Sequence, residues 1–159
     1  MTDFGRLLTS LADAQVEFVV IGGLAVVAHG HVRATMDLDV CYARSPENHR
    51  RLITALAALH PRLRGAPEGL PFTWDERTLK NGLNFTLVTD LGELDLLGEV
   101  TGVGGYGNLA VTADVVLLFG HSVKVVDLAT LIASKAATGR PKDLLDLEAL
   151  RALQLRARQ

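Results

Sequence analysis

The fold class is decided by two neighbouring stretches, VEFVVIGG at residues 16–23 and TMDLDV at residues 35–40. The apolar run over residues 16–21 predicts a strand, and the Gly22-Gly23 pair predicts a turn into a short helix over residues 24–29. If residues 36–42 form the next strand, side-chain alternation places Asp37 and Asp39 on one face, about 6.5–7 Å apart. Two carboxylates that close repel each other unless a cation lies between them. Mg²⁺ suits such a position, because it binds one or two carboxylates together with substrate phosphates.

Each of these motifs also has a plain structural interpretation. The Gly22-Gly23 pair could expose backbone N–H groups to a phosphate at the start of a helix, or could be a tight turn without a ligand. The two aspartates could form a solvated strand edge with Arg33 as their partner. An apolar strand makes uncompensated carboxylates costly, which favours a metal site.

A third carboxylate lies in GELDLL at residues 92–97, which predicts another apolar strand with Glu93 and Asp95 on one face. If this strand pairs beside residues 37–40, Asp95 completes a cluster with Asp37 and Asp39. Such a cluster can hold two metal ions about 3.5–4 Å apart. Asp95 would then also be a candidate general base for an incoming hydroxyl. The alternative is an ordinary exposed strand position.

The candidate phosphate-binding cations lie near the end of the chain. Lys135 falls on the apolar stripe of a helix expected over residues 127–138, where a lysine either snorkels to solvent or meets an anion. The stretch GRPKDLLD at residues 139–146 then supplies Arg140, Lys142 and Asp146. Lys142 and Asp146 are spaced i, i+4, so they could equally be a surface pair.

The remaining patterns predict a mixed α/β organisation of the α+β class. We expect helices over residues 4–11, from Pro46 with Ser45 as N-cap, and a last helix that starts at Pro141. We expect a loop over residues 60–71, a hairpin over residues 84–97 that turns at Gly92, and strands over residues 113–119 and 123–126. This order predicts a mixed sheet with flanking helices in one domain, residues 1–159.

Two further motifs have weaker support. The stretch GVGGYG at residues 102–107 matches the G-x-G-x-x-G dinucleotide fingerprint. We expect it to be irregular, because no apolar-periodic helix or βαβ unit surrounds it. The stretch HGH at residues 29–31 suggests zinc, but no third ligand is placed near it.

Composition narrows the function classes. Hydrophobic residues make up 48% of the 159 residues and charged residues 21%, which is typical of a folded protein. The formal charge of −2 gives no global basic field for nucleic acid. The single cysteine, Cys41, excludes an internal disulfide and a cysteine-based zinc site, and suits a cytoplasmic protein. The first residues predict no signal peptide, and no apolar run approaches the ~20 residues of a membrane span.

Together these residues resemble the DNA polymerase β-like nucleotidyltransferase superfamily, which is marked by Gly-Gly or Gly-Ser, a spacer and Asp-x-Asp. Here Gly23 and Asp37 are separated by thirteen residues. The fuller pattern, with His29-Gly30, Arg33 and Thr35, is similar to the AbiEii-type branch, which includes toxins of toxin–antitoxin systems. The later blocks at residues 92–97 and 135–146 fit the same branch.

The resemblance implies a polymerase β-like nucleotidyltransferase fold and transfer of an NMP from an NTP to a hydroxyl, with release of pyrophosphate. The cofactor would be Mg²⁺ or Mn²⁺. The metal-binding and catalytic residues would be Asp37, Asp39 and Asp95. The nucleotide-binding residues would be Gly22, Gly23, Arg33, Thr35, Lys135, Arg140, Lys142 and Asp146. Gly23 replaces the serine of many active members, so one hydroxyl contact to phosphate is missing.

The sequence does not identify the acceptor of the NMP. A toxin would modify tRNA and have a cognate antitoxin as partner, whereas other enzymes of this class modify a partner protein or a small molecule such as an antibiotic. A third hypothesis is a catalytically degenerate binding module. A hydrophobic surface helix could also make a dimer, but the sequence does not identify one.

Overall fold

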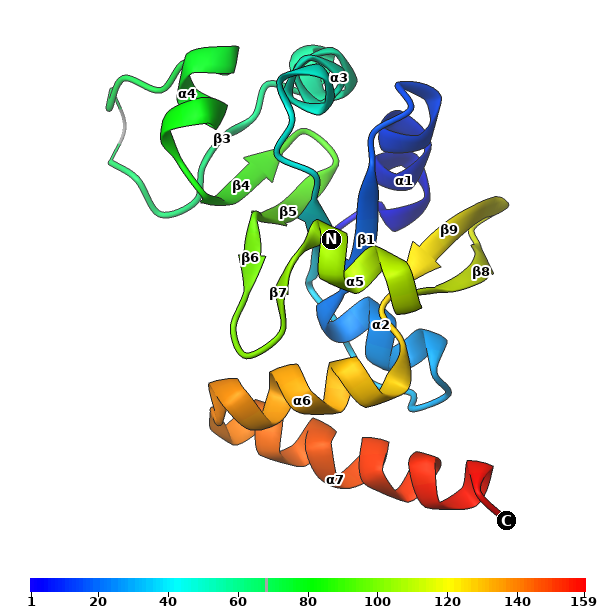
Figure 1. Ribbon diagram of the computed structural model, residues 1–159. Helices are drawn as coiled ribbons and strands as arrows, with labels where there is room; N and C mark the ends of the chain where they lie inside the picture. The colour runs from blue at the N-terminus through cyan, green and yellow to red at the C-terminus, as the bar shows by residue number, and fades with distance from the viewer. Residues whose placement is uncertain (68) are drawn as a thin grey trace.

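The computed structural model describes residues 1–67 and 69–159 (Figure 1). Helices and strands intermix along the chain, as the sequence predicts. The helices are α1 (Phe4–Asp13), α2 (Gly22–Ala28), α3 (Pro46–Leu56), α4 (Glu76–Asn81), α5 (Tyr106–Thr112), α6 (Leu128–Thr138) and α7 (Pro141–Ala157), with a 3-10 turn at Ala57–Leu59. The strands are β1 (Phe18–Ile21), β2 (Asp37–Tyr42), β3 (Arg62–Leu63), β4 (Asn84–Thr89), β5 (Gly92–Leu97), β6 (Glu99–Val100), β7 (Gly104–Gly105), β8 (Asp114–Leu118) and β9 (His121–Val125).

The main sheet is mixed and has seven strands in the order β3-β4-β5-β2-β1-β9-β8. β2 pairs antiparallel with β1 and parallel with β5. The register of β2 and β5 places Asp39 opposite Asp95 and Asp37 opposite Glu93. The pairing that the candidate carboxylate cluster requires is therefore confirmed.

Side-chain alternation gives β2 and β5 two different faces. Leu38 and Val40 in β2, and Leu94 and Leu96 in β5, have no exposed surface. The intervening aspartates are only partly buried and lie on the opposite face. The apolar face packs into the core with α1, whose Leu7, Leu8 and Leu11 are also fully buried. The core thus fixes the plane from which the carboxylates project.

Local signals account for most element boundaries. Ser45 caps α3 by accepting a hydrogen bond from the Asn48 backbone N–H, and Asp127 caps α6 in the same way through Thr130. Gly92 turns the β4–β5 hairpin with φ +119°, and Gly139 ends α6 with φ +61°. Both glycines adopt the left-handed region that side chains disfavour.

Three expectations need correction, and one helix was not predicted. α2 begins at Gly22, so the glycine pair forms its first turn instead of preceding it. The segment expected as a loop over residues 60–71 contains the short strand β3, and residue 68 lies outside the described residues. The GVGGYG stretch is partly regular, because β7 leads directly into α5. The helix that was not predicted is α4, which begins after its N-cap, Asp75.

The last two helices lie side by side as an antiparallel pair, at the end of the molecule opposite α1 and α3 (Figure 1). Only Gly139 and Arg140 separate α6 from α7, which explains the tight pairing. None of the helices in the described part of the chain has the length and apolar character that crossing a bilayer requires.

Candidate active site

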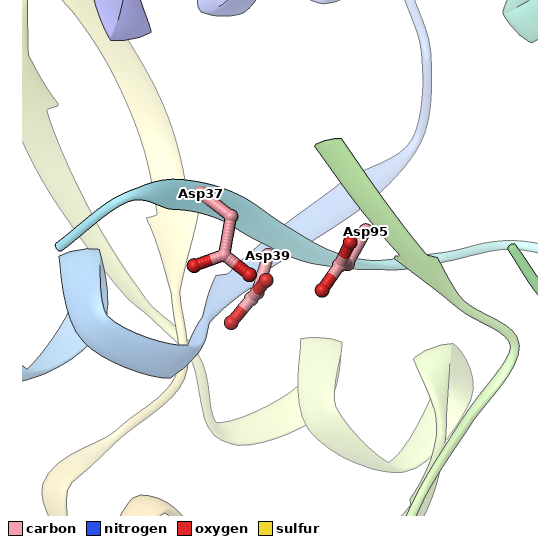
Figure 2. Close-up of side chains that lie close together, drawn as sticks. All are labelled: Asp37, Asp39 and Asp95. Atoms are coloured by element: carbon pink, nitrogen blue, oxygen red, sulfur yellow. The ribbon is translucent and has the colours of Figure 1, made fainter. Parts of the chain in front are cut away.

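Three carboxylates meet at the open face of β2 and β5 (Figure 2). One oxygen from each of Asp37, Asp39 and Asp95 lies within 4.8 Å of the others. Two come from alternate positions of one strand and the third from the paired position of its parallel neighbour. The sequence-based prediction that these three side chains converge is confirmed.

The pKa values of Asp37 and Asp39 are shifted in opposite directions. Burial, the neighbouring charge of Asp37 and hydrogen bonding to Asp37 raise the pKa of Asp39 to about 9. Burial also opposes ionisation of Asp37, but hydrogen bonds with Asp39 and Asp95 and the cations of Arg64 and Lys142 lower its pKa. Without a metal ion, Asp39 therefore holds a proton at neutral pH while Asp37 is ionised.

Asp39 also carries a buried polar atom without a partner. Its Oδ1 is buried and accepts no hydrogen bond within the described residues. A carboxylate oxygen in that state costs free energy unless a further group binds it. Together, the carboxylate oxygens of Asp37, Asp39 and Asp95 are the kind of ligand set that Mg²⁺ and Mn²⁺ prefer. The residues present therefore fit a divalent cation.

The Gly22-Gly23 pair lies beside the carboxylate cluster and lines the same pocket. Gly22 adopts φ +67°, and a Cβ at this position would overlap the Asp39 carboxylate. A Cβ at Gly23 would lie 2.5 Å from Oγ1 of Thr35 and 3.3 Å from Nη2 of Arg33. Gly22 must therefore be glycine for the backbone to approach the Asp39 carboxylate, whereas a side chain at Gly23 would require the Thr35 side chain to move.

A pocket of about 340 Å³ opens beside the cluster. Its lining brings together most of the residues that the sequence singled out, from three separate parts of the chain. They are Gly22, Gly23, Arg33, Thr35, Asp37, Asp39, Lys135, Arg140 and Lys142. Asp95 and Asp146 are not among the lining residues. An oxygen of Asp95 lies within 4.8 Å of oxygens of Asp37 and Asp39, and the buried Asp146 pairs with Arg33 and Lys135 of the lining.

Lys135 is held differently from the expectation of a phosphate ligand. Its Nζ lies 3.2 Å from Oδ1 of Asp143 and 3.0 Å from Oδ2 of Asp146, and all three side chains are buried. The other oxygen of Asp146 lies 3.1 Å from Nε of Arg33. The buried carboxylates of Asp143 and Asp146 thus balance the charge of Lys135. Because Asp146 also pairs with Arg33, the ion network links Arg33 to α6 and α7.

Arg140 also belongs to the network. Its Nε donates to Oδ2 of Asp143 at 2.7 Å, while more than half of its side chain stays exposed. Burial opposes ionisation of Asp143, but hydrogen bonds from Arg140, Thr138 and Lys135 hold its pKa below the ordinary value. Lys142 makes none of the ion pairs found within the described residues, so its charge acts on the pocket itself.

Sequence reasoning missed Arg64 and Asp143. Nη2 of Arg64 lies 2.8 Å from Oδ1 of Asp95 and donates to the Leu87 carbonyl at 2.9 Å. No local pattern marks Arg64, because the pairing of β3 with β4 brings it to the cluster. Asp143 did carry a signal: it follows Arg140 by three residues, which is the spacing of a capping box.

Comparison with known proteins supports the architecture. No protein-family model matches the sequence, and no curated protein is similar to it. Among solved structures, the lincosamide antibiotic adenylyltransferase LnuA, bound to lincomycin, is similar with a TM-score of 0.62 and 13% identity over 96% of this chain and 98% of that chain. ANT(2")-Ia in complex with adenylyl-2"-tobramycin is also similar, with a TM-score of 0.58 and 14% identity over 96% of this chain and 93% of that chain.

A third similar structure comes from Thermotoga maritima and is assigned provisionally to the nucleotidyltransferases. It gives a TM-score of 0.59 and 16% identity over 98% of this chain and 96% of that chain. At these identities the similarity shows the fold alone. The chain has the mixed α+β fold of the nucleotidyltransferases, as the sequence predicted.

Proposed function

We propose that this protein is a metal-dependent nucleotidyltransferase, which moves an NMP from an NTP to a hydroxyl acceptor and releases pyrophosphate. One observation carries the proposal. Asp37, Asp39 and Asp95 converge beside the Gly22 backbone, and the buried Oδ1 of Asp39 has no hydrogen-bond partner in the described residues. The fold similarity to nucleotidyltransferases adds support, because it is independent of the carboxylate geometry.

Asp37 and Asp39 are the proposed holders of Mg²⁺ or Mn²⁺, with Asp95 as the third ligand. When bound, the ion neutralises phosphate charge and orients the reacting oxygens. Asp39 must release its proton before it can bind a cation, because only the ionised carboxylate is a good ligand. Metal affinity is therefore expected to rise with pH up to about 9, where Asp39 titrates in the metal-free protein.

Asp95 is also the proposed general base. The acceptor oxygen forms a bond to the α-phosphorus, the bond from the α-phosphorus to the bridging oxygen breaks, and pyrophosphate leaves. The proton of the acceptor hydroxyl passes to Asp95. Burial and the neighbouring Asp37 raise the pKa of Asp95 above its ordinary value, and Arg64, at 2.8 Å, limits that rise and so favours the ionised base.

The triphosphate is proposed to lie along Gly22-Gly23, with Arg33 and Thr35 beside it. Lys142 and the exposed part of Arg140 supply positive charge at the same pocket. Lys135 and Asp146 belong to the nucleotide site by resemblance. In this chain we assign them an indirect role, since their ion pairs hold Arg33 in position.

The acceptor implied by the AbiEii-type resemblance is tRNA, with the protein acting as a cytoplasmic toxin that has a cognate antitoxin. A small-molecule acceptor is the second candidate. It is favoured by two similar structures, one bound to lincomycin and one to adenylyl-2"-tobramycin, and by the formal charge of −2. A partner protein as acceptor and a degenerate binding module are the remaining alternatives.

Label transfer tests the proposal and separates these acceptors. The protein is incubated with Mg²⁺ and each α-labelled NTP in the presence of total RNA, a candidate partner protein, or tobramycin and lincomycin. Transfer by wild type, lost in Asp39→Asn and kept in the matched control Asp114→Asn on the exposed strand β8, supports the proposal. Equal behaviour of wild type and Asp39→Asn with every NTP and acceptor contradicts it.

A further inference from the structure

α7 carries three leucines that no other part of the described chain covers. Leu144, Leu145 and Leu155 are 55%, 71% and 62% exposed. The opposite side of the same helix is buried and carries Leu147 and Leu150. Leu144 and Leu155 share one face of α7, because eleven residues correspond to about three helical turns, whereas Leu145 lies about 100° around the helix from Leu144. Leu144 and Leu155 are therefore the two ends of an exposed patch on that face.

The spacing of this patch is that of a helix–helix seam. Leu144, Glu148, Arg151 and Leu155 follow one another at intervals of four, three and four residues, and all are exposed. Apolar residues at alternating intervals of three and four form the contact line between two packed helices. The two central positions are instead a glutamate and an arginine, which take part in no ion pair among the described residues.

The seam is complementary to itself when two copies meet in antiparallel orientation. A two-fold axis midway between Glu148 and Arg151 places Leu144 of each copy opposite Leu155 of the other. The same axis places each Glu148 opposite the Arg151 of the other copy. A parallel arrangement would instead put glutamate against glutamate and arginine against arginine, which is unfavourable.

We propose that two copies of this chain associate through antiparallel α7 helices along the seam of Leu144, Glu148, Arg151 and Leu155. The contact is isologous, so it closes as a dimer instead of extending into a filament. A surface of one helix per copy is small, which predicts a weak and concentration-dependent dimer.

The position of α7 permits this association. The helix lies at the outer end of the molecule (Figure 1). The four seam residues are exposed, and none of them lines the pocket of the candidate active site. Asp143 and Asp146 project from the other face of α7 into the buried ion network. That network fastens α7 to the body of the protein, so the seam is presented on a fixed helix.

Reversal of the two central charges tests the proposal. Sedimentation velocity is measured on the full chain from about 5 to about 500 µM, a range suited to small interfaces. Wild type is expected to shift from monomer to dimer within this range. Glu148→Arg and Arg151→Glu should each raise the dimer dissociation constant by about tenfold or more, because each places like charges opposite one another. Arg156→Glu on the same helix, outside the seam, is the matched control and should keep the wild-type constant.

The decisive sample is an equimolar mixture of Glu148→Arg and Arg151→Glu. Across the proposed axis, one copy then offers two arginines to the two glutamates of the other, so the mixture should dimerise although neither variant does so alone. A monomeric wild type over the whole range overturns the proposal. A dimer that survives both reversals, or a mixture that stays monomeric, overturns it as well, because the contact would then not follow this seam.

Discussion

Asp39→Asn should stabilise the metal-free protein at alkaline pH, although it removes a central residue of the candidate active site. In the folded chain the pKa of Asp39 is raised to about 9 by burial and by the charge of Asp37. In the unfolded chain it returns to the ordinary value of 3.8. Between these values the folded state holds a proton that the unfolded state has lost, so the free energy of unfolding falls as pH rises.

The size of this effect follows from the same shift. Each pH unit between the two pKa values costs about 1.4 kcal/mol, so wild type should lose about 3 kcal/mol between pH 6 and pH 8 from this group. The amide of Asn does not titrate, so Asp39→Asn should lack this loss. Mg²⁺ at about 100 times its dissociation constant should add about 2.7 kcal/mol to wild type and little to the variant.

Urea unfolding in EDTA at pH 6, 7 and 8 measures the loss, and repetition with Mg²⁺ measures the gain. The single tryptophan, Trp74, is partly buried and provides the fluorescence signal. Asp114→Asn, which removes an exposed carboxylate on β8, is the control and should follow wild type. The reasoning is refuted if metal-free wild type keeps or gains stability from pH 6 to pH 8, or if Mg²⁺ stabilises Asp39→Asn as strongly as wild type.

Three other substitutions test separate parts of the site. Gly22→Ala should reduce kcat/KM by about 100-fold, since its Cβ would displace the Asp39 carboxylate; an unchanged rate would mean that this close approach is unimportant. Lys135→Met should lower the free energy of unfolding by about 3–5 kcal/mol in urea, because it leaves buried carboxylates uncompensated, and a neutral effect would contradict the ion network. Arg64→Met should move the acidic limb of the pH–rate profile to higher pH, because the cation that lowers the pKa of Asp95 is gone; an unmoved limb would argue against Asp95 as base.

Local pattern was sufficient for much of this fold. The alternation of apolar and acidic residues in β2 and β5 predicted which side chains face the core, and Gly92 predicted the hairpin turn. Ser45 and Asp127 marked helix starts through capping, which depends only on residues three positions away. These features follow from short-range sterics and hydrogen bonding, and so are readable without the rest of the chain.

The remaining features depend on contacts between distant segments. The partners of Lys135 lie in the following helix, so the sequence could place the lysine on an apolar stripe but could not show that carboxylates compensate it from inside. Arg64 reaches Asp95 through strand pairing across more than thirty positions, which no local periodicity records. The exposed seam of α7 becomes visible only once packing defines which face of the helix is buried.

The central claim is that the three aspartates and the glycine turn together hold a divalent cation and a triphosphate. Crystals grown with Mn²⁺ and a non-hydrolysable NTP analogue test it most directly, because Mn²⁺ gives its own anomalous signal. The account predicts an anomalous peak within ligand distance of Asp37 and Asp39, with the triphosphate along Gly22-Gly23. Triphosphate bound elsewhere, or crystals with full nucleotide occupancy and no metal at the aspartates, would contradict it.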